Sequence, residues 1–594
     1  MRTGGPLRPV VSAGPPSQAG LDKRHAFPLV KGRRAMPRWE LGSSATRSLS
    51  PYGLPALLLL LVATTVLFLL GFPYEQLLAT TTTTMWAHRA VLLTPAAVAV
   101  ATAAAAVDLS WHASGRTPYN NLSAVVGGEG VPKFVFEPSG NWEDGTSNWC
   151  NMPHVRPQEY VRPSSEFELK YVEVIHRHHK RTPYSSNAFP VESYRWNCDD
   201  QGLFVYGQPL SPDGSRSSAQ AYWQGAVSPL NTFVPSGWVG TCQFPQITTG
   251  GLDDSARHGD DLYAVYHTLL GLLPDRASGA PAWRARTRFR VTQNVITSQV
   301  AGMLVAGMTR STGPIPLEIQ AAGVDSLEPQ YPCPAAAAAL SRAQTPAADP
   351  AWAAHLAAAS PLYTRLDDIS GVPAADAGFH KSLDHYFDNL SARQCHAKPL
   401  PCKLVPDGTG GVVRNDTSAC VDQALADQVY RFGHWEYAHV YRGSRETLGA
   451  AAAAMGVWVA ELAAHLREAA ACGGGGGGAS SGGGIVYRHN VAHDGSVSRL
   501  LSVLQLDEMV WPGMGSEVVF ELWRRRKDAP AGGGGSGGGY FVRTLFSGKV
   551  LKSASPALGE MDMLPLDTLL AYFDGLVGDR AGLVVDKCNG HIPL

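Results

Sequence analysis

The chain has 594 residues, of which 17% are charged, and a formal net charge of −1 at pH 7. This length supplies material for one large domain or several small ones, and the balanced charge gives no reason to expect a nucleic-acid partner. The 9 cysteines are widely spaced and include no C-x-x-C pair, so zinc-ribbon spacing is absent. A few disulfides, with one cysteine left over, are expected if the domain is lumenal.

The N-terminal part of the sequence has the pattern of a membrane anchor. Residues 1–53 are rich in Lys and Arg, contain only Asp22 and Glu40 as acids, and predict a disordered basic tail. Residues 54–72 form an uncharged apolar run that is long enough to cross a bilayer core as one helix. Because the basic flank precedes this run, we expect a single-pass type II protein with a cytosolic tail and a lumenal remainder.

Alternatives to this topology stay open. A cleaved signal peptide would give a secreted protein, although its apolar core is usually shorter and lies closer to the start of the chain. A transit peptide would also be basic and poor in acids, but it would not normally contain so long an apolar run. Residues 90–107 are mostly alanine and predict a helix within a stalk over 73–165, with a second membrane span as the alternative.

Other local patterns lie in the part of the chain that follows the expected anchor. Asn121, Asn389 and Asn415 begin N-x-Ser/Thr triplets, which mildly favour a glycosylated lumenal part. The glycine-rich stretches at 473–484 and 532–539 cannot pack a core and predict flexible loops.

Residues 171–183, which read Y-V-E-V-I-H-R-H-H-K-R-T-P, combine a strand with a cationic end. The first five residues are mostly β-branched or aromatic and predict a buried strand, and Pro183 prevents the strand from continuing. Cations and histidines at the carboxyl end of a strand lie where open α/β sheets bind ligands. The pattern therefore indicates a site for an anionic substrate. A metal-binding histidine tract and a solvated charged loop are the alternatives.

A second polar stretch follows another predicted strand far downstream. Residues 485–491 predict this strand, and His493, Asp494 and Gly495 come just after it. Polar side chains are again delivered at a strand's carboxyl end. A plain turn is the alternative, because Asp and Gly both favour turns.

Residues 177–183 resemble the Arg-His-Gly-x-Arg-x-Pro signature of the histidine acid phosphatases, with His179 in place of the usual Gly. The resemblance implies that His178 attacks phosphorus and forms a phosphohistidine. It also implies that Arg177 and Arg181 hold phosphate oxygens through planar, bidentate donors.

The later His-Asp pair resembles the second signature of the same family. The resemblance implies that His493 binds phosphate and that Asp494 is the general acid, because a poor alkoxide leaving group needs a proton as its bond breaks. The cationic cluster would stabilise the transferring phosphoryl group without a metal. We therefore expect no metal and no cofactor in the reaction, an acidic pH optimum and resistance to chelators.

The resemblance covers roughly residues 168–590, interrupted by low-complexity segments. Four further blocks are similar to fungal-type membrane and secreted members of the family, at 251–263, 288–301, 393–402 and 511–523.

Two details differ from the family pattern. Many members have a third phosphate-binding arginine where this sequence has Asn294, so Arg288, Arg290 or His179 would have to complete the pocket. Residues 257–259 contain Arg-His-Gly more literally than the first motif does, but they lack the rest of the signature. The neighbouring acids suit the first turn of a helix, so we interpret this triplet as a helix start.

The fold implied by the resemblance is α/β, with a largely parallel sheet flanked by helices and an inserted, mainly α-helical lid. The phosphatase domain is expected over 166–594 and its lid over about 190–280 and 315–450. Strands are expected at 171–177, 285–292, 485–491, 516–524 and 540–546, and helices at 422–442 and 446–470.

The function implied by the resemblance is that of an acid phosphatase, a hydrolase of small-molecule or glycan phosphomonoesters. Phosphorylated sugars, glycans, inositol phosphates and protein side chains all stay open as substrates. The alternative is a catalytically silent member that binds phosphorylated or anionic glycans, motivated by the missing third arginine and by His179. A phosphomutase is a third, weaker hypothesis, since its general acid is usually a Glu located elsewhere.

Overall fold

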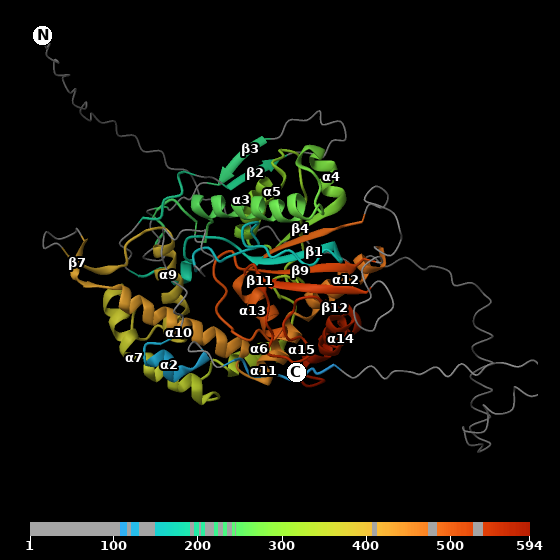
Figure 1. The fold of residues 1–594 in the computed structure, drawn as a ribbon. Coiled ribbons are helices and arrows are strands. Elements are labelled where there is room, and N and C mark those ends of the chain that lie inside the picture. The colour runs from blue at the N-terminus through green and yellow to red at the C-terminus, as the bar shows by residue number, and fades with distance from the viewer. Residues whose placement is uncertain are drawn as a thin grey trace, which may run out of the picture. The chain divides into compact units, whose positions relative to one another are not determined.

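The described part of the chain is built around one mixed β-sheet (Figure 1). In the computed structural model, the described residues are 107–115, 120–129, 149–190, 195–200, 203–207, 219–223, 228, 230–233, 240–243, 245–406, 413–472, 484–526 and 539–594. Within these residues, the sheet has eight strands in the order β11-β10-β9-β1-β8-β4-β5, with β12 paired to β10.

The strands that carry the predicted site run parallel to one another. They are β1 (Phe167–Arg177), β8 (Tyr487–Ala492), β4 (Thr287–Val291) and β5 (Leu317–Ile319). Because Arg177 pairs with Ala492 and Val291 pairs with Val491, the carboxyl ends of β1, β8 and β4 meet at one edge of the sheet. The last seven residues of β1 are all buried, as expected for a parallel strand covered on both faces.

The other half of the sheet is antiparallel. Its strands are β9 (Glu517–Arg525), β10 (Tyr540–Phe546), β11 (Lys549–Val550) and β12 (Leu564–Pro565). The predicted α/β fold is confirmed, and strands are present at all five expected places. The difference lies at β9, which runs antiparallel to both of its neighbours, β1 and β10.

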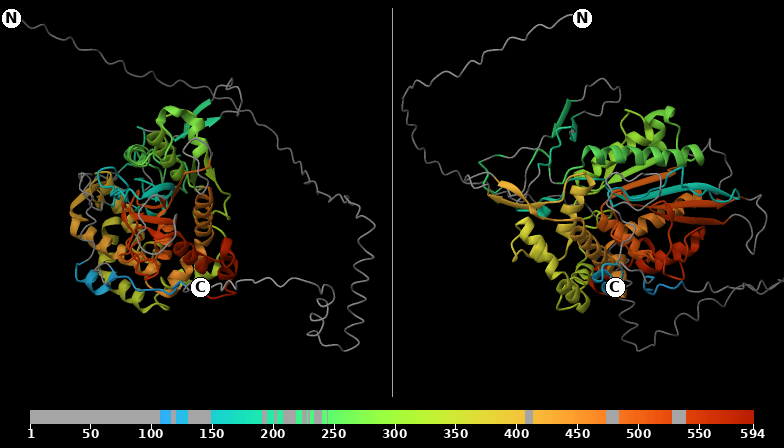
Figure 2. Two further views of the ribbon diagram at one scale, coloured as in Figure 1. Left: turned by 45° about the vertical axis from the view of Figure 1, so that its right-hand side comes forward. Right: turned by 60° about the vertical axis from the view of Figure 1, so that its left-hand side comes forward.

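Helices cover both faces of the sheet (Figures 1 and 2). On β1, Tyr171 and Ile175 point into one core, whereas Val172 and Val174 point into another, as the alternation of a strand requires. The first core is closed by α6 (Pro334–Arg342), α11 (Arg445–Ala454), α12 (Gly456–Cys472), α13 (Asp494–Val503), α14 (Leu566–Val577) and α15 (Val584–Asn589). The second core is closed by α3 (Thr249–Tyr263), which continues into a π-helix at Ala264–Leu269, α4 (Gly279–Arg286) and α5 (Val295–Thr309).

A third core is mainly helical, and most of its helices lie in the region where the lid was expected. It contains α2 (Leu122–Val126), α7 (Pro350–Ser370), α8 (Ala377–His380), α9 (Asp384–Cys395) and α10 (Gln423–Arg442). The helix expected at 422–442 is therefore present as α10. The helix expected at 446–470 is instead broken at Met455 into α11 and α12, which meet at a bend of 67°.

Two small hairpins and four disulfides complete the described structure. The hairpins are β2 (Leu203–Gly207) with β3 (Ala219–Trp223), and β6 (Cys402–Pro406) with β7 (Val413–Cys420). The disulfides are Cys150–Cys395, Cys198–Cys242, Cys333–Cys588 and Cys402–Cys420. The expectation of a few disulfides is thus confirmed.

Several predictions fall outside the described residues. These are the basic tail 1–53, the membrane anchor 54–72, the stalk as far as residue 106, and all but the last residue of each glycine-rich loop. Among the helices that the structure describes, none is by itself long and apolar enough to cross a membrane, and only the bent pair α11 and α12 meets the criteria of length and composition.

Three expectations differ from the described structure. Residues 149–165, placed in the stalk, are packed against the domain, where Trp149 is 1% exposed and Cys150 is bonded to Cys395. Asn389 is fully buried in α9 and donates to the carbonyl of Asn187 at 2.9 Å, so it cannot accept a glycan in the folded chain. The triplet 257–259 lies in the interior of α3, because that helix begins earlier, after its N-cap Thr248.

Candidate active site

The polar residues of the two sequence motifs line one cavity at the carboxyl edge of the sheet. His178 directly follows β1, while His493 and Asp494 follow β8 and begin α13. The cavity has a volume of about 330 Å³, and Arg177 and Arg181 contribute to the same wall. The five residues expected to bind phosphate or act on it therefore come together in space.

The side chain of His178 is held in one tautomer. It is 1% exposed, and its Nδ1 lies 3.0 Å from the backbone carbonyl oxygen of His179. Because a carbonyl can only accept, Nδ1 carries the proton and donates it, which leaves the lone pair of a neutral imidazole on Nε2. Burial, together with the guanidinium groups of Arg181 and Arg177, keeps the pKa of His178 well below its ordinary value. The resting imidazole of His178 is thus neutral.

Arg177 lies between the cavity and the buried ring of Trp149. Its Nη1 donates to the carbonyl of Pro512 at 2.6 Å, and its guanidinium stacks over the ring of Trp149 at 5.0 Å. Its Nη2 lies 3.0 Å from Oδ2 of Asp494. These contacts fix the plane of the guanidinium and keep one edge directed at the carboxylate of the second motif.

Arg181 is anchored in a similar way by helix α9. Its Nη1 lies 3.0 Å from Oδ1 of Asp388, and Oδ2 of the same carboxylate accepts from the side chain of Asn187 at 2.8 Å. The ring of Tyr184 lies under the guanidinium at 4.2 Å. The contact with Asp388 ties α9 to the first motif, so this helix and the sheet position the arginine together.

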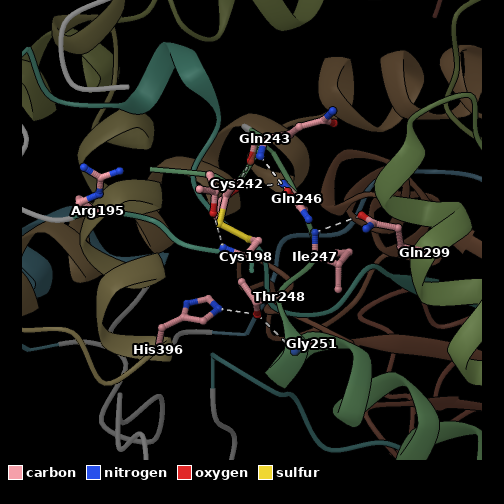
Figure 3. Close-up of a disulfide and its surroundings, with 12 residues drawn as sticks. Arg195, Cys198, Cys242, Gln243, Gln246, Ile247, Thr248, Gly251, Gln299 and His396 are labelled. Atoms are coloured by element: carbon pink, nitrogen blue, oxygen red, sulfur yellow. Dashed lines mark hydrogen bonds between the residues drawn. A yellow bond between two sulfur atoms is a disulfide. The ribbon is translucent and has the colours of Figure 1, made fainter. Parts of the chain in front are cut away.

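A disulfide-linked segment supports the end of the first motif (Figure 3). Thr182 and Gln246 exchange backbone and side-chain hydrogen bonds of 2.9 and 3.0 Å. The same segment is fixed by the Cys198–Cys242 disulfide and by the 2.7 Å contact between Thr248 Oγ1 and His396 Nε2 (Figure 3). These contacts restrain the backbone immediately after Arg181.

Asp494 is surrounded by donors. Its Oδ2 accepts from Trp511 Nε1 at 2.9 Å and from the hydroxyl of Tyr437 at 3.4 Å, and Tyr437 stacks on Trp511 at 3.9 Å. Burial favours the neutral acid, but Arg177 and the Trp511 hydrogen bond outweigh burial and lower the pKa of Asp494. The carboxyl is therefore ionised in the empty site.

His493 faces His178 across the cavity, with their ring centroids 5.5 Å apart. Its Nε2 lies 2.9 Å from Thr292 Oγ1 and 3.5 Å from Oε2 of Glu328. Burial, with a smaller contribution from Arg181 and Arg177, lowers its pKa to about 4 despite the nearby Asp494. His493 is thus a neutral hydrogen-bonding group over most of the pH range.

The other three candidate residues do not line this cavity. Asn294 caps α5, where its side chain accepts from the backbone N–H of Ile296 at 3.3 Å. Arg290 lines a separate cavity of about 220 Å³ and is paired with Asp325 at 3.1 Å and Glu461 at 2.8 Å. His179 is fully buried, with 0% of its surface exposed.

A third arginine nevertheless reaches the cavity from α13. Arg499 lines it, donates to the carbonyl of Gly495 at 2.9 Å and lies over the ring of Tyr441 at 5.7 Å. The sequence analysis missed this residue. Once a helix is taken to begin at Asp494, a residue four positions after Gly495 falls on the same helix face, which is the signal that could have identified it.

Two further carboxyl groups line the cavity and were also missed. Asp384 begins α9, and Glu328 lies between β5 and α6. Burial, reinforced by Asp388 and Asp494, raises the pKa of Asp384 to about 7. Burial, with Asp325 and Asp494, also raises the pKa of Glu328. These two acids are therefore readily protonated.

The sequence matches no protein-family model and no curated protein. Among solved structures, the apo form of Hafnia alvei phytase is similar at 14% identity and a TM-score of 0.40, over 71% of this chain and 99% of that chain. The phytase from D. castellii is similar at 12% identity and a TM-score of 0.40, over 81% and 94%. The Bifidobacterium longum multiple inositol polyphosphate phosphatase, in complex with inositol hexasulfate, is similar at 12% identity and 0.37, over 70% and 93%. We base the functional inference on the side chains of the cavity.

Proposed function

We propose that this chain is a phosphomonoester hydrolase of the histidine acid phosphatase type, with His178 as nucleophile and Asp494 as proton donor. The observation that carries the proposal is the fixed tautomer of His178, whose unprotonated Nε2 belongs to a cavity that also contains two buried guanidinium groups and a carboxyl group. A neutral imidazole nitrogen beside phosphate-binding arginines is suited to phosphoryl transfer. The sequence resemblance to the family supports the same roles.

In the first step, Nε2 of His178 attacks phosphorus and the bond from phosphorus to the ester oxygen breaks. Arg177 and Arg181 hold the phosphoryl oxygens and neutralise their charge. Asp494 gives its proton to the departing ester oxygen, so the alcohol leaves neutral. The ionised Asp494 of the empty site must first gain this proton. A phosphate dianion supports that change, because it competes for Arg177 and its negative charge raises the pKa of a neighbouring carboxyl.

In the second step, water attacks the phosphohistidine. Asp494, now a carboxylate, takes a proton from the attacking water, and the phosphorus–nitrogen bond breaks. Inorganic phosphate leaves, and His178 returns to its neutral form with the proton still on Nδ1. The same carboxyl group therefore acts as acid and then as base.

The charge of the cavity limits the substrate. Of the cavity-lining arginines, Arg177 is paired with Asp494 and Arg181 with Asp388. This pairing leaves Arg499 to balance the two remaining acids, Glu328 and Asp384. Once these two acids are ionised, which for Asp384 requires a pH above about 7, a leaving group with several further phosphates would meet like charge there, which costs binding free energy. We infer that the preference for a substrate with one phosphate and an uncharged or cationic alcohol is strongest at the pH where both acids are charged.

The proposal also includes the membrane topology expected from the sequence. Residues 54–72 would anchor the chain in a membrane of the secretory route, with the catalytic part in the lumen. If so, alkaline carbonate would leave the full chain in the membrane pellet, and protease added to sealed vesicles would spare residues after 107. Release of the chain by carbonate would contradict the anchor.

Hydrolysis of p-nitrophenyl phosphate by the full chain tests the enzymatic proposal. We expect turnover at acidic pH, loss of at least about 10³-fold in kcat with His178→Ala, and full activity with His591→Ala, a matched substitution of an exposed histidine. Equal activity in His178→Ala would remove the proposed nucleophile. Phosphate binding without turnover by folded wild-type chain would instead favour the silent glycan-binding alternative.

A further inference from the structure

Two histidines that the proposed reaction does not use lie together behind the nucleophile. They are His179, which replaces the usual Gly of the first motif, and His258, from the triplet inside α3. His179 Nε2 lies 3.1 Å from His258 Nδ1. His176 completes the group, because one ring nitrogen of each residue lies within 4.8 Å of the others. All three side chains are 0% exposed.

The hydrogen bonds around this trihistidine cluster fix the tautomer of His258 and leave one buried nitrogen of His176 without a partner among the described residues. His258 Nε2 lies 2.9 Å from Oε2 of Glu517, and since a carboxylate only accepts, Nε2 carries the proton and Nδ1 is unprotonated in the neutral ring. His176 Nδ1 is engaged by His489 Nε2 at 2.7 Å. His176 Nε2 is completely buried and has no hydrogen-bond partner within the described residues.

We propose that His176, His179 and His258 bind a first-row transition-metal dication of the Zn²⁺ type. Imidazole nitrogens are preferred ligands of such ions. Two nitrogens each at about 2.0–2.1 Å from a tetrahedral ion lie about 3.3 Å apart, which is close to the 3.1 Å between His179 and His258. Glu517 supplies the outer carboxylate that commonly orients a metal-bound histidine.

A metal explains the cluster better than a hydrogen-bond network alone. A purely hydrogen-bonded arrangement satisfies the contact between His179 and His258, but it leaves His176 Nε2 buried without a partner. Buried polar nitrogens are rarely left in that state. An ion between the three rings would engage this nitrogen together with the other two.

The ion would position the nucleophile without entering the reaction. None of its three ligands lines the catalytic cavity. His178 lies in the chain between two of them and donates its Nδ1 proton to the carbonyl of His179, so an ion on His179 would fix the group that sets the tautomer. Because the ligands are fully buried, we expect uptake during folding and no release to chelators during an assay.

Metal analysis of the full chain, expressed without a histidine tag in zinc-supplemented medium and washed with EDTA, tests this site. We expect close to one zinc per chain by elemental mass spectrometry. His258→Gln and His179→Gly should reduce the content by at least tenfold. His355→Gln, which changes an equally buried histidine of the helical core, should leave it unchanged. Wild-type chain without zinc, or unchanged zinc in both cluster variants, would overturn the proposal.

A second measurement covers the case in which the cluster variants do not fold. Wild-type chain produced with Co²⁺ in place of zinc is analysed by X-ray absorption at the cobalt edge. Three nitrogen neighbours at about 2.0–2.1 Å support the trihistidine site. A shell of oxygen neighbours alone, or no bound cobalt, overturns it. Neither measurement depends on phosphatase activity, so failure of this site is distinguishable from failure of the proposed reaction.

Discussion

Nη2 of Arg177 lies 3.0 Å from Oδ2 of Asp494, which joins the end of the first motif to the start of the second. In the empty site this pair keeps the proposed general acid ionised. A bound phosphate would take over the guanidinium and allow Asp494 to hold the proton that the leaving group needs.

Asp494→Asn is expected to slow the hydrolysis of esters with a basic leaving group more than the hydrolysis of esters with a weakly basic one. The variant cannot protonate the ester oxygen, so kcat/KM for a simple alkyl phosphate should fall by about 10²–10⁴-fold. For p-nitrophenyl phosphate, whose leaving group needs no proton, kcat/KM should fall less than about tenfold. An equal loss on both esters, measured by release of inorganic phosphate, would show that Asp494 is not the proton donor.

The value of kcat on an alkyl phosphate should be higher at acidic pH than at neutral pH. The protonated form of Asp494 is the active one, so kcat is highest below the pKa of Asp494 in the substrate complex. It should fall about tenfold for each pH unit above that pKa. Asp494→Asn should remove this slope between pH 3 and 8. A wild-type rate that rises with pH over this range would contradict the assignment.

We expect the ionisation of Asp384 to make the choice between substrates depend on pH. Its pKa of about 7 means that it is neutral in acid and charged at pH 8. The preference for a monophosphate over a polyphosphorylated ester, expressed as the ratio of kcat/KM values, should therefore increase from pH 5 to pH 8. Asp384→Asn should flatten this change without loss of activity on p-nitrophenyl phosphate. A ratio that is independent of pH in the wild type would argue against the acidic lining as a selector.

Arg499 is expected to contribute to phosphate binding in place of the missing third arginine. A charge-assisted hydrogen bond contributes about 1.5–3 kcal/mol, so Arg499→Ala should raise the inhibition constant for inorganic phosphate by roughly 10- to 150-fold. Arg290→Ala is the matched control, because Arg290 lines the other cavity and should leave that constant unchanged. Equal effects of the two substitutions would exclude a direct role for Arg499.

Gly307→Ala is expected to destabilise the domain. Helices α3 and α5 approach so closely that a methyl group at Gly307 would overlap the carbonyl oxygen of Ala256, and overpacking of this kind costs about 1–3 kcal/mol. Gly302 lies on the same helix with open space around it. Gly302→Ala should therefore raise, or leave unchanged, the midpoint of thermal unfolding, whereas Gly307→Ala should lower it. The same midpoint for both variants would contradict this packing.

The parts of the fold that sequence could predict are those with a local pattern. A run of β-branched and aromatic residues at 171–175 predicted strand β1, and the motif residues after β1 and β8 converge because parallel strands end at one edge. Strand β5 was missed because Leu317–Ile319 is too short to show a period. The break at Met455 was missed because an alanine-rich sequence suits a continuous helix on either side.

The parts of the site that sequence could not predict depend on contacts between distant segments. Asp384 and Glu328 come from different parts of the chain, and neither has a local pattern that places it beside Asp494. The role of Asn294 as a helix cap was hidden by the expectation of an arginine at that place. His179 and His258 are 79 positions apart in sequence, and only the packing of α3 against the sheet brings them together.

The most direct measurement of the central claim is the chemical state of His178 during turnover. Full chain is mixed with p-nitrophenyl phosphate, quenched in alkali, digested, and analysed by mass spectrometry for an acid-labile, base-stable phosphate. We predict phosphate on His178, in larger amount in Asp494→Asn because the second step lacks its base, and none in His178→Ala. Rapid turnover with no phosphate on His178, or with phosphate on another residue, would contradict the account.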